Sequence, residues 1–66
     1  MMRKLIISAL EAKYDGEIQE ALCNVEIYLH NPAGIGEHSE ILEAINIQLS
    51  KMTEAQEKKE ILNIFE

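Results

Sequence analysis

The sequence predicts an all-α fold, a two-helix antiparallel hairpin that pairs with a second copy to form a four-helix bundle dimer. Apolar residues recur at helical spacing on both sides of the midpoint, and apart from Gly16 every glycine and proline falls within residues 31–36. A chain of 66 residues also buries only about 60% of the surface that its unfolded form exposes, so a partner is needed to complete the core. The expected single domain has a helix over about 3–30, a turn over 31–37 and a helix over about 38–65.

The first helix is indicated by apolar residues at steps of three and four. These are Ile7, Leu10, Tyr14, Ile18, Ala21, Val25 and Tyr28. Several pairs are eleven residues apart, which predicts one stripe along a nearly straight helix. A second apolar edge, formed by Ile6, Leu22 and Leu29, widens this stripe enough for two neighbours. Gly16 costs about 1 kcal/mol relative to alanine and is a tolerated defect, a close helix crossing or a kink.

The turn is predicted from Asn31, Pro32, Gly34 and Gly36. Proline disfavours the α conformation in the residue before it, so the first helix should end near residue 30. Two glycines before a helix also resemble part of a phosphate-binding loop, but no strand precedes them and no lysine follows. We therefore interpret the segment as a helix-connecting turn.

The second helix is indicated by a stripe of Ile41, Leu42, Ile45, Leu49, Met52, Ala55, Leu62 and Phe65. The stripe weakens near Gln56, and Thr53 to Gln56 has the form of a capping box, so a break near Thr53 is one possibility. One continuous helix is favoured because no glycine or proline interrupts this segment.

Two helices of matched length joined by a short connection should be antiparallel. Each has an apolar face that can contact more than one neighbour, so a homodimer is expected, with a higher oligomer as the alternative. The residues expected in the core or interface are Ile7, Leu10, Tyr14, Ile18, Val25, Ile41, Ile45, Leu49, Met52, Leu62 and Phe65.

Composition excludes several classes of protein. A net charge of −6 repels nucleic-acid phosphate. No window approaches the roughly 20 apolar residues that span a bilayer, and the apolar run after Lys4 is too short for a secretion signal. The single cysteine, Cys23, cannot form an internal disulfide and is expected to be a small buried residue. These features predict a cytoplasmic protein that binds neither nucleic acid nor membrane.

No catalytic set is recognisable, because no nucleophile, base and orienting group can be named together, and no enzyme activity or cofactor is expected. The nearest candidates for a metal site are His30, Glu37 and His38, which lack the spacing of helical metal motifs. The leading hypothesis is a non-enzymatic protein that self-associates and acts through protein–protein interaction. The alternative is a module that sequesters a small ligand or metal at the turn, around His30 and Gly34 to His38.

The segment from Asn31 to Ile41, NPAGIGEHSEI, resembles small uncharacterised helical-hairpin proteins of tailed bacteriophages. A looser likeness extends through Ala9 to Tyr14 and the glutamate-rich closing segment. The resemblance implies a phage-encoded structural or host-directed factor in the host cytoplasm, and it implies no particular activity.

Overall fold

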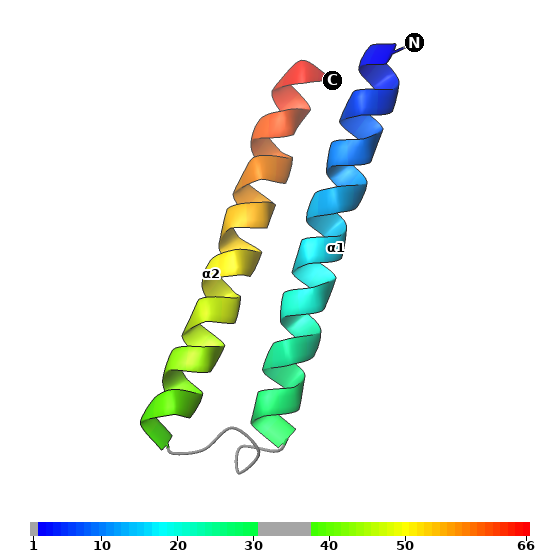
Figure 1. Ribbon diagram of the computed structural model, residues 1–66. Coiled ribbons are helices and arrows are strands. Elements are labelled where there is room, and N and C mark those ends of the chain that lie inside the picture. The colour runs from blue at the N-terminus through cyan, green and yellow to red at the C-terminus, as the bar shows by residue number, and fades with distance from the viewer. Residues whose placement is uncertain (1, 31–37) are drawn as a thin grey trace.

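The computed structural model describes residues 2–30 and 38–66, and there the chain is helical. Helix α1 covers Met2–His30, helix α2 covers His38–Leu62, and a short 3-10 helix, η2, covers Asn63–Phe65. Figure 1 shows α1 and α2 antiparallel and side by side, with the start of α1 and the end of η2 at the same end. The predicted all-α helical hairpin is therefore confirmed for these residues. The predicted turn residues Asn31, Pro32, Gly34 and Gly36 lie outside them.

The hairpin is elongated, measuring 50 × 15 × 12 Å. Its radius of gyration is 15.1 Å, whereas a compact domain of this length would have about 11 Å. Its accessible surface is 5123 Å², against about 4,250 Å² for a typical folded monomer of 7.5 kDa. A single copy therefore leaves about 900 Å² more surface in water than its mass requires.

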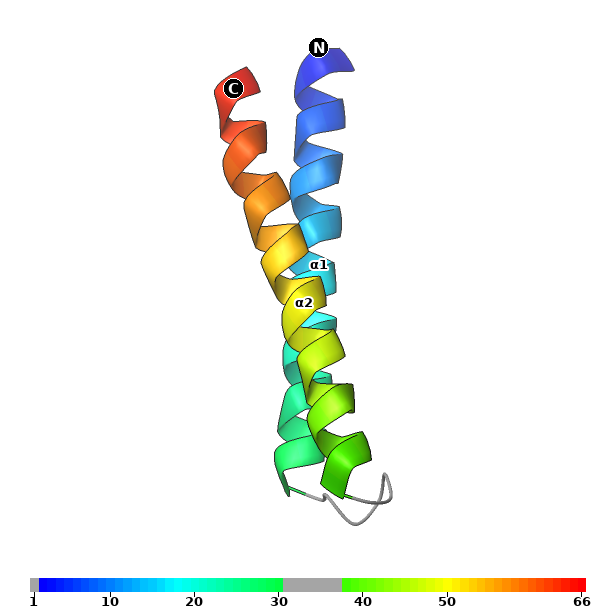
Figure 2. The same cartoon turned by 90° about the vertical axis from the view of Figure 1, so that its left-hand side faces the viewer.

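The two helices meet along a seam whose residues recur every seven positions. The seam positions are Ile7, Tyr14, Ala21 and Tyr28 of α1 and Ile41, Gln48, Ala55 and Leu62 of α2. Seven-residue spacing is typical of helices that wrap around each other, and Figure 2 shows α1 and α2 crossing at a shallow angle. The predicted stripe of α1, whose pairs are eleven residues apart, also faces this seam, because every one of its residues is buried or half-buried.

The interior of the hairpin is very small. Ala21 and Ala55 are each 2% exposed and Gln48 is 8% exposed, and among the described residues no large side chain is fully buried. Alanines let the two helix backbones approach closely, but each buries little apolar area. The single hairpin thus has a seam without an enclosed apolar core.

Polar contacts across the seam fix how the helices are aligned. Asn24 Nδ2 donates to Gln48 Oε1 over 3.2 Å, and Lys59 Nζ lies 2.5 Å from an Asp15 carboxylate oxygen. Lys58 Nζ lies 5.9 Å from the centroid of the Tyr14 ring. At the chain ends, the Arg3 guanidinium donates to the backbone carbonyl of Phe65. All of these contacts join residues that face each other in one antiparallel register.

Helix α2 runs without a break through Thr53. The Thr53 hydroxyl donates to the Leu49 carbonyl over 2.9 Å, so it bonds within the helix instead of capping a new one. Helix α1 likewise continues through Gly16, where an added methyl group would meet no atom within 4 Å. A close crossing of α2 at Gly16 is therefore wrong, and within the single hairpin the glycine is a tolerated defect.

Candidate protein-interaction surface

One side of the hairpin has an apolar face in the half far from the chain ends. Ile18 of α1 and Met52 of α2 line the same groove, which places these two helix edges on one side. Further apolar residues lie on the same edges, because they follow at helical spacing. We define the apolar face as Ile18, Leu22, Val25 and Leu29 of α1 with Leu42, Ile45, Leu49 and Met52 of α2.

The leucines of the apolar face are open to solvent. Leu22 is 43% exposed and Leu29 is 59% exposed, while Leu42 and Leu49 are 71% and 47% exposed. The other four members are half-buried and connect the leucines to the seam. The face is therefore a continuous surface over both helices, and contact with another molecule would remove all four leucines from water.

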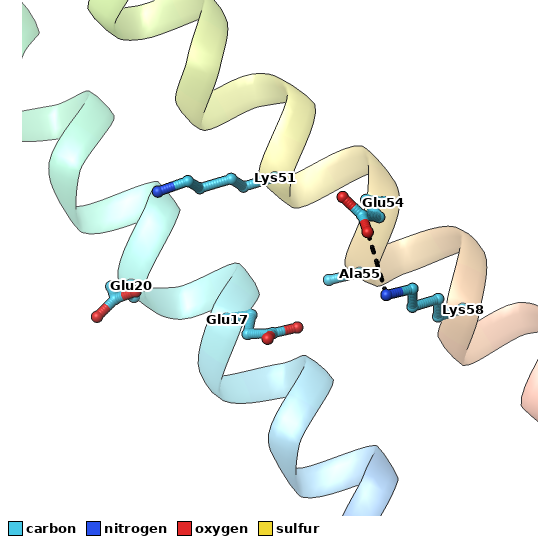
Figure 3. A pocket seen from close by; sticks show the side chains of 6 residues that line it. All are labelled: Glu17, Glu20, Lys51, Glu54, Ala55 and Lys58. Carbon is cyan, nitrogen blue, oxygen red and sulfur yellow. Dashed lines mark ion pairs between the residues drawn. The ribbon is translucent and has the colours of Figure 1, made fainter.

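The other edge of the seam is charged at its middle. A shallow groove there is lined by Glu17, Glu20, Lys51, Glu54, Ala55 and Lys58 (Figure 3). Glu54 and Lys58 form an ion pair of 3.1 Å within α2, and Lys51 extends across the groove toward α1. The exposed Ile27 and Ile47 lie on this same edge nearer the turn, so the charged groove separates them from the chain ends.

A second apolar area lies at the chain ends. A hollow there is lined by Arg3, Ile6, Ile7, Leu10, Leu62 and Phe65. Ile6 and Phe65 are both more than half exposed. This area is separated along the hairpin from the apolar face, because it involves the first turns of α1 and the last turns of α2.

The residues predicted for the core or interface divide into two groups. Nine of them are half-buried along the seam: Ile7, Leu10, Tyr14, Ile18, Val25, Ile41, Ile45, Met52 and Leu62. Leu49 and Phe65 are exposed and do not belong to the interior of the single hairpin. Cys23 is also exposed, so its predicted burial is wrong, because it lies two positions beyond seam residue Ala21 and points away from α2.

The candidate metal residues are not brought together in the described part of the chain. His30 is exposed, its Nδ1 donates to the Glu26 carbonyl over 2.8 Å, and the same nitrogen lies 3.5 Å from the Glu26 carboxylate. Residues 2–30 and 40–66 contain no group of three or more side chains placed to hold a metal ion. Glu37, Gly34 and the side chain of His38 lie outside the residues whose placement is described.

Charges in the half nearer the chain ends influence one another across the seam. Partial burial raises the pKa of Glu11 above the ordinary 4.5, and the nearby Glu66 and Asp15 carboxylates raise it further, while Lys59 opposes them. The hydrogen bond and charge of Asp15 raise the pKa of Lys59 above 10.5, as those of Glu54 do for Lys58. Lys58 and Lys59 therefore keep their positive charge, whereas the surroundings of Glu11 disfavour its ionised form.

Sequence reasoning missed the polar members of the seam. Gln48 is buried, and Asn24, Glu17 and Lys59 are half-buried, although none belongs to an apolar stripe. The seven-residue interval from Ile41 to Gln48, and then to Ala55, was the signal that could have found Gln48.

Comparisons of this chain with protein-family models, curated proteins and solved structures found no significant match. Neither helix, over the residues described, contains an apolar stretch long enough to cross a membrane.

Proposed function

We propose that this chain is a non-enzymatic helical hairpin that self-associates through its apolar face and acts by protein–protein contact. The observation that carries the proposal is the distribution of burial. Four leucines on one face are 43–71% exposed, while two alanines and one glutamine are the buried residues of the described chain. Fully burying one leucine side chain contributes about 1.5–3 kcal/mol, so covering this face strongly favours association.

The surface area also suits a second copy. The hairpin exposes about 900 Å² more than a typical monomer of its mass, and a standard interface buries about 800 Å² on each partner. Two hairpins in face-to-face contact form a four-helix bundle, in which the half-buried Ile18, Val25, Ile45 and Met52 become core residues. The expected assembly is a dimer.

The resemblance of residues 31–41 to proteins of tailed bacteriophages supports a biological setting for this assembly. In that setting the dimer is a phage-encoded structural or host-directed factor that works in the host cytoplasm. Its surfaces outside the bundle, including the hollow around Phe65, are then available for a protein partner.

A pair of neighbouring substitutions tests the proposal. Leu49→Glu places a charge in the apolar face, whereas Ser50→Glu places the same charge on the next residue, which is exposed and outside the face. Sedimentation equilibrium at micromolar concentration should give a dimer for the unaltered chain and for S50E, and a monomer for L49E.

Circular dichroism of the same samples guards against a folding artefact. Leu49 is already 47% exposed in the single hairpin, so L49E removes little intrachain burial. Loss of helix in L49E but not in S50E would also support the proposal, because it would show that folding depends on the covered face. Equal masses for the unaltered chain, L49E and S50E would overturn it.

A further inference from the structure

The apolar face ends abruptly halfway along the hairpin. Four lines of residues run along this side, two on each helix, and the members of a line are seven positions apart. Each line changes from apolar to polar residues at about the same distance from the chain ends. On α1 the lines read Leu29, Leu22, Asp15 and Val25, Ile18, Glu11. On α2 they read Leu42, Leu49, Gln56 and Ile45, Met52, Lys59. Because all four lines change together, the side consists of an apolar distal half and a charged terminal half.

The charged half is costly to cover. Asp15 and Lys59 already form an ion pair across the seam, and Glu11 already has a raised pKa. The groove that begins at Ile18 and Met52 continues past Thr53 and Gln56 to the carboxylates Glu57 and Glu60. Burying these groups against the same half of a second copy would remove their hydration, and because the carboxylates there outnumber Lys59, unpaired negative charge would remain buried.

These two halves select one way of pairing copies. If two hairpins aligned with their chain ends together, charged half would be buried against charged half. If they overlapped fully in the opposite orientation, the charged half of each would cover the apolar half of the other. An antiparallel pair whose overlap is centred on the apolar face buries apolar surface on apolar surface and leaves most of both charged halves in water.

We infer that the partner is a second copy bound in this antiparallel, partly overlapped arrangement. The inference rests on the self-association proposed above and adds its geometry. The twofold axis passes near the level of Asn24 and Gln48, the middle of the apolar face, and brings Leu49 of one copy next to Leu49 of the other. Helix α1 extends 22 residues from Asn24 to Met2, or about 33 Å on each side of the axis. The dimer is thus about 66 Å long, compared with 50 Å for one hairpin, so the two copies overlap over about 34 Å.

Cysteine cross-linking tests the geometry. Cys23→Ser first removes the native thiol, which is exposed. In that background, Leu49→Cys should give a disulfide-linked dimer as the main product of mild oxidation, because the two introduced thiols meet near the axis. A mixture of separate Leu22→Cys and Leu49→Cys chains should give little heterodimer, since α1 contacts α1 and α2 contacts α2 of the other copy.

The same chains separate failure of the geometry from failure of the proposed function. A sedimenting dimer in which L22C links to L49C, while L49C does not link to itself, would overturn the antiparallel pairing and leave self-association intact. A monomer in sedimentation would overturn both. Small-angle scattering of the Cys23→Ser dimer gives an independent reading, where a maximum dimension close to 50 Å instead of about 66 Å would contradict the partial overlap.

Discussion

The side-chain amides of Asn24 and Gln48 form a hydrogen bond of 3.2 Å that joins the two helices near the middle of the hairpin. Gln48 is 8% exposed and Asn24 is half-buried, so this bond is partly shielded from water. A polar pair at one seam position costs stability but fixes the register of two helices, since any slip leaves both amides unpaired.

Replacing one member of this hydrogen-bonded pair should lower the free energy of unfolding more than replacing both. Asn24→Ala leaves the buried Gln48 amide without its partner, and we expect a loss of about 1–3 kcal/mol in the free energy of unfolding. Asn24→Leu combined with Gln48→Met replaces both amides by apolar groups of similar size. Urea unfolding of N24L, Q48M and the double variant should show a coupling of about 1 kcal/mol. Strict additivity of the two single effects would show that the hydrogen bond does not contribute to stability.

Gly16→Ala should stabilise the hairpin. The added methyl group meets no atom within 4 Å, and Gly16 lies in the interior of α1. Alanine at an exposed helix position gains about 1 kcal/mol over glycine, which raises the melting temperature by about 4–8 °C in a domain of this size. Thermal unfolding by circular dichroism measures the shift. A lower melting temperature would mean that α1 needs the freedom of glycine at this position.

Glu11→Gln should stabilise the protein at pH 7 and have little effect in acid. The pKa of Glu11 is raised in the fold above 4.5, because of partial burial and then of the nearby Glu66 carboxylate. Between 4.5 and the raised value the folded state binds more protons than the unfolded state, so stability falls as pH rises through this window. The neutral glutamine removes that loss.

Melting temperatures of the unaltered chain and E11Q at pH 4 and pH 7 provide the comparison. Below pH 4.5 Glu11 is mostly protonated in both the folded and the unfolded state, so the melting temperatures of the two proteins should become similar there. A lower melting temperature for E11Q at pH 7 would show that attraction between the Glu11 carboxylate and Lys59 outweighs the partial burial of Glu11 and its repulsion by Glu66 and Asp15.

The two helices could be predicted because their signals are local. Apolar steps of three and four, and the concentration of glycine and proline at residues 31–36, are sufficient to place a hairpin in this chain. The continuity of α2 through Thr53 also follows from the absence of helix-breaking residues in that segment.

The division between seam and apolar face could not be predicted in the same way. Leu49 and Met52 are both apolar and three residues apart, yet Leu49 is exposed and Met52 is half-buried. Which of them contacts α1 depends on how the helices wrap around each other, and that depends on which small residues, here Ala21 and Ala55, are buried in the seam. Gln48 escaped prediction for the same reason, because its burial results from its position in the seam and not from its polarity.

Sedimentation equilibrium of the unaltered chain over a range of concentrations, together with its melting temperature, tests self-association most directly. A single chain has a mass of 7.5 kDa, so the dimer should appear at about 15 kDa. Its melting temperature should rise with protein concentration, because association stabilises the folded state by mass action. A helical chain that stays at 7.5 kDa at micromolar concentration, with a melting temperature independent of concentration, would contradict the central claim.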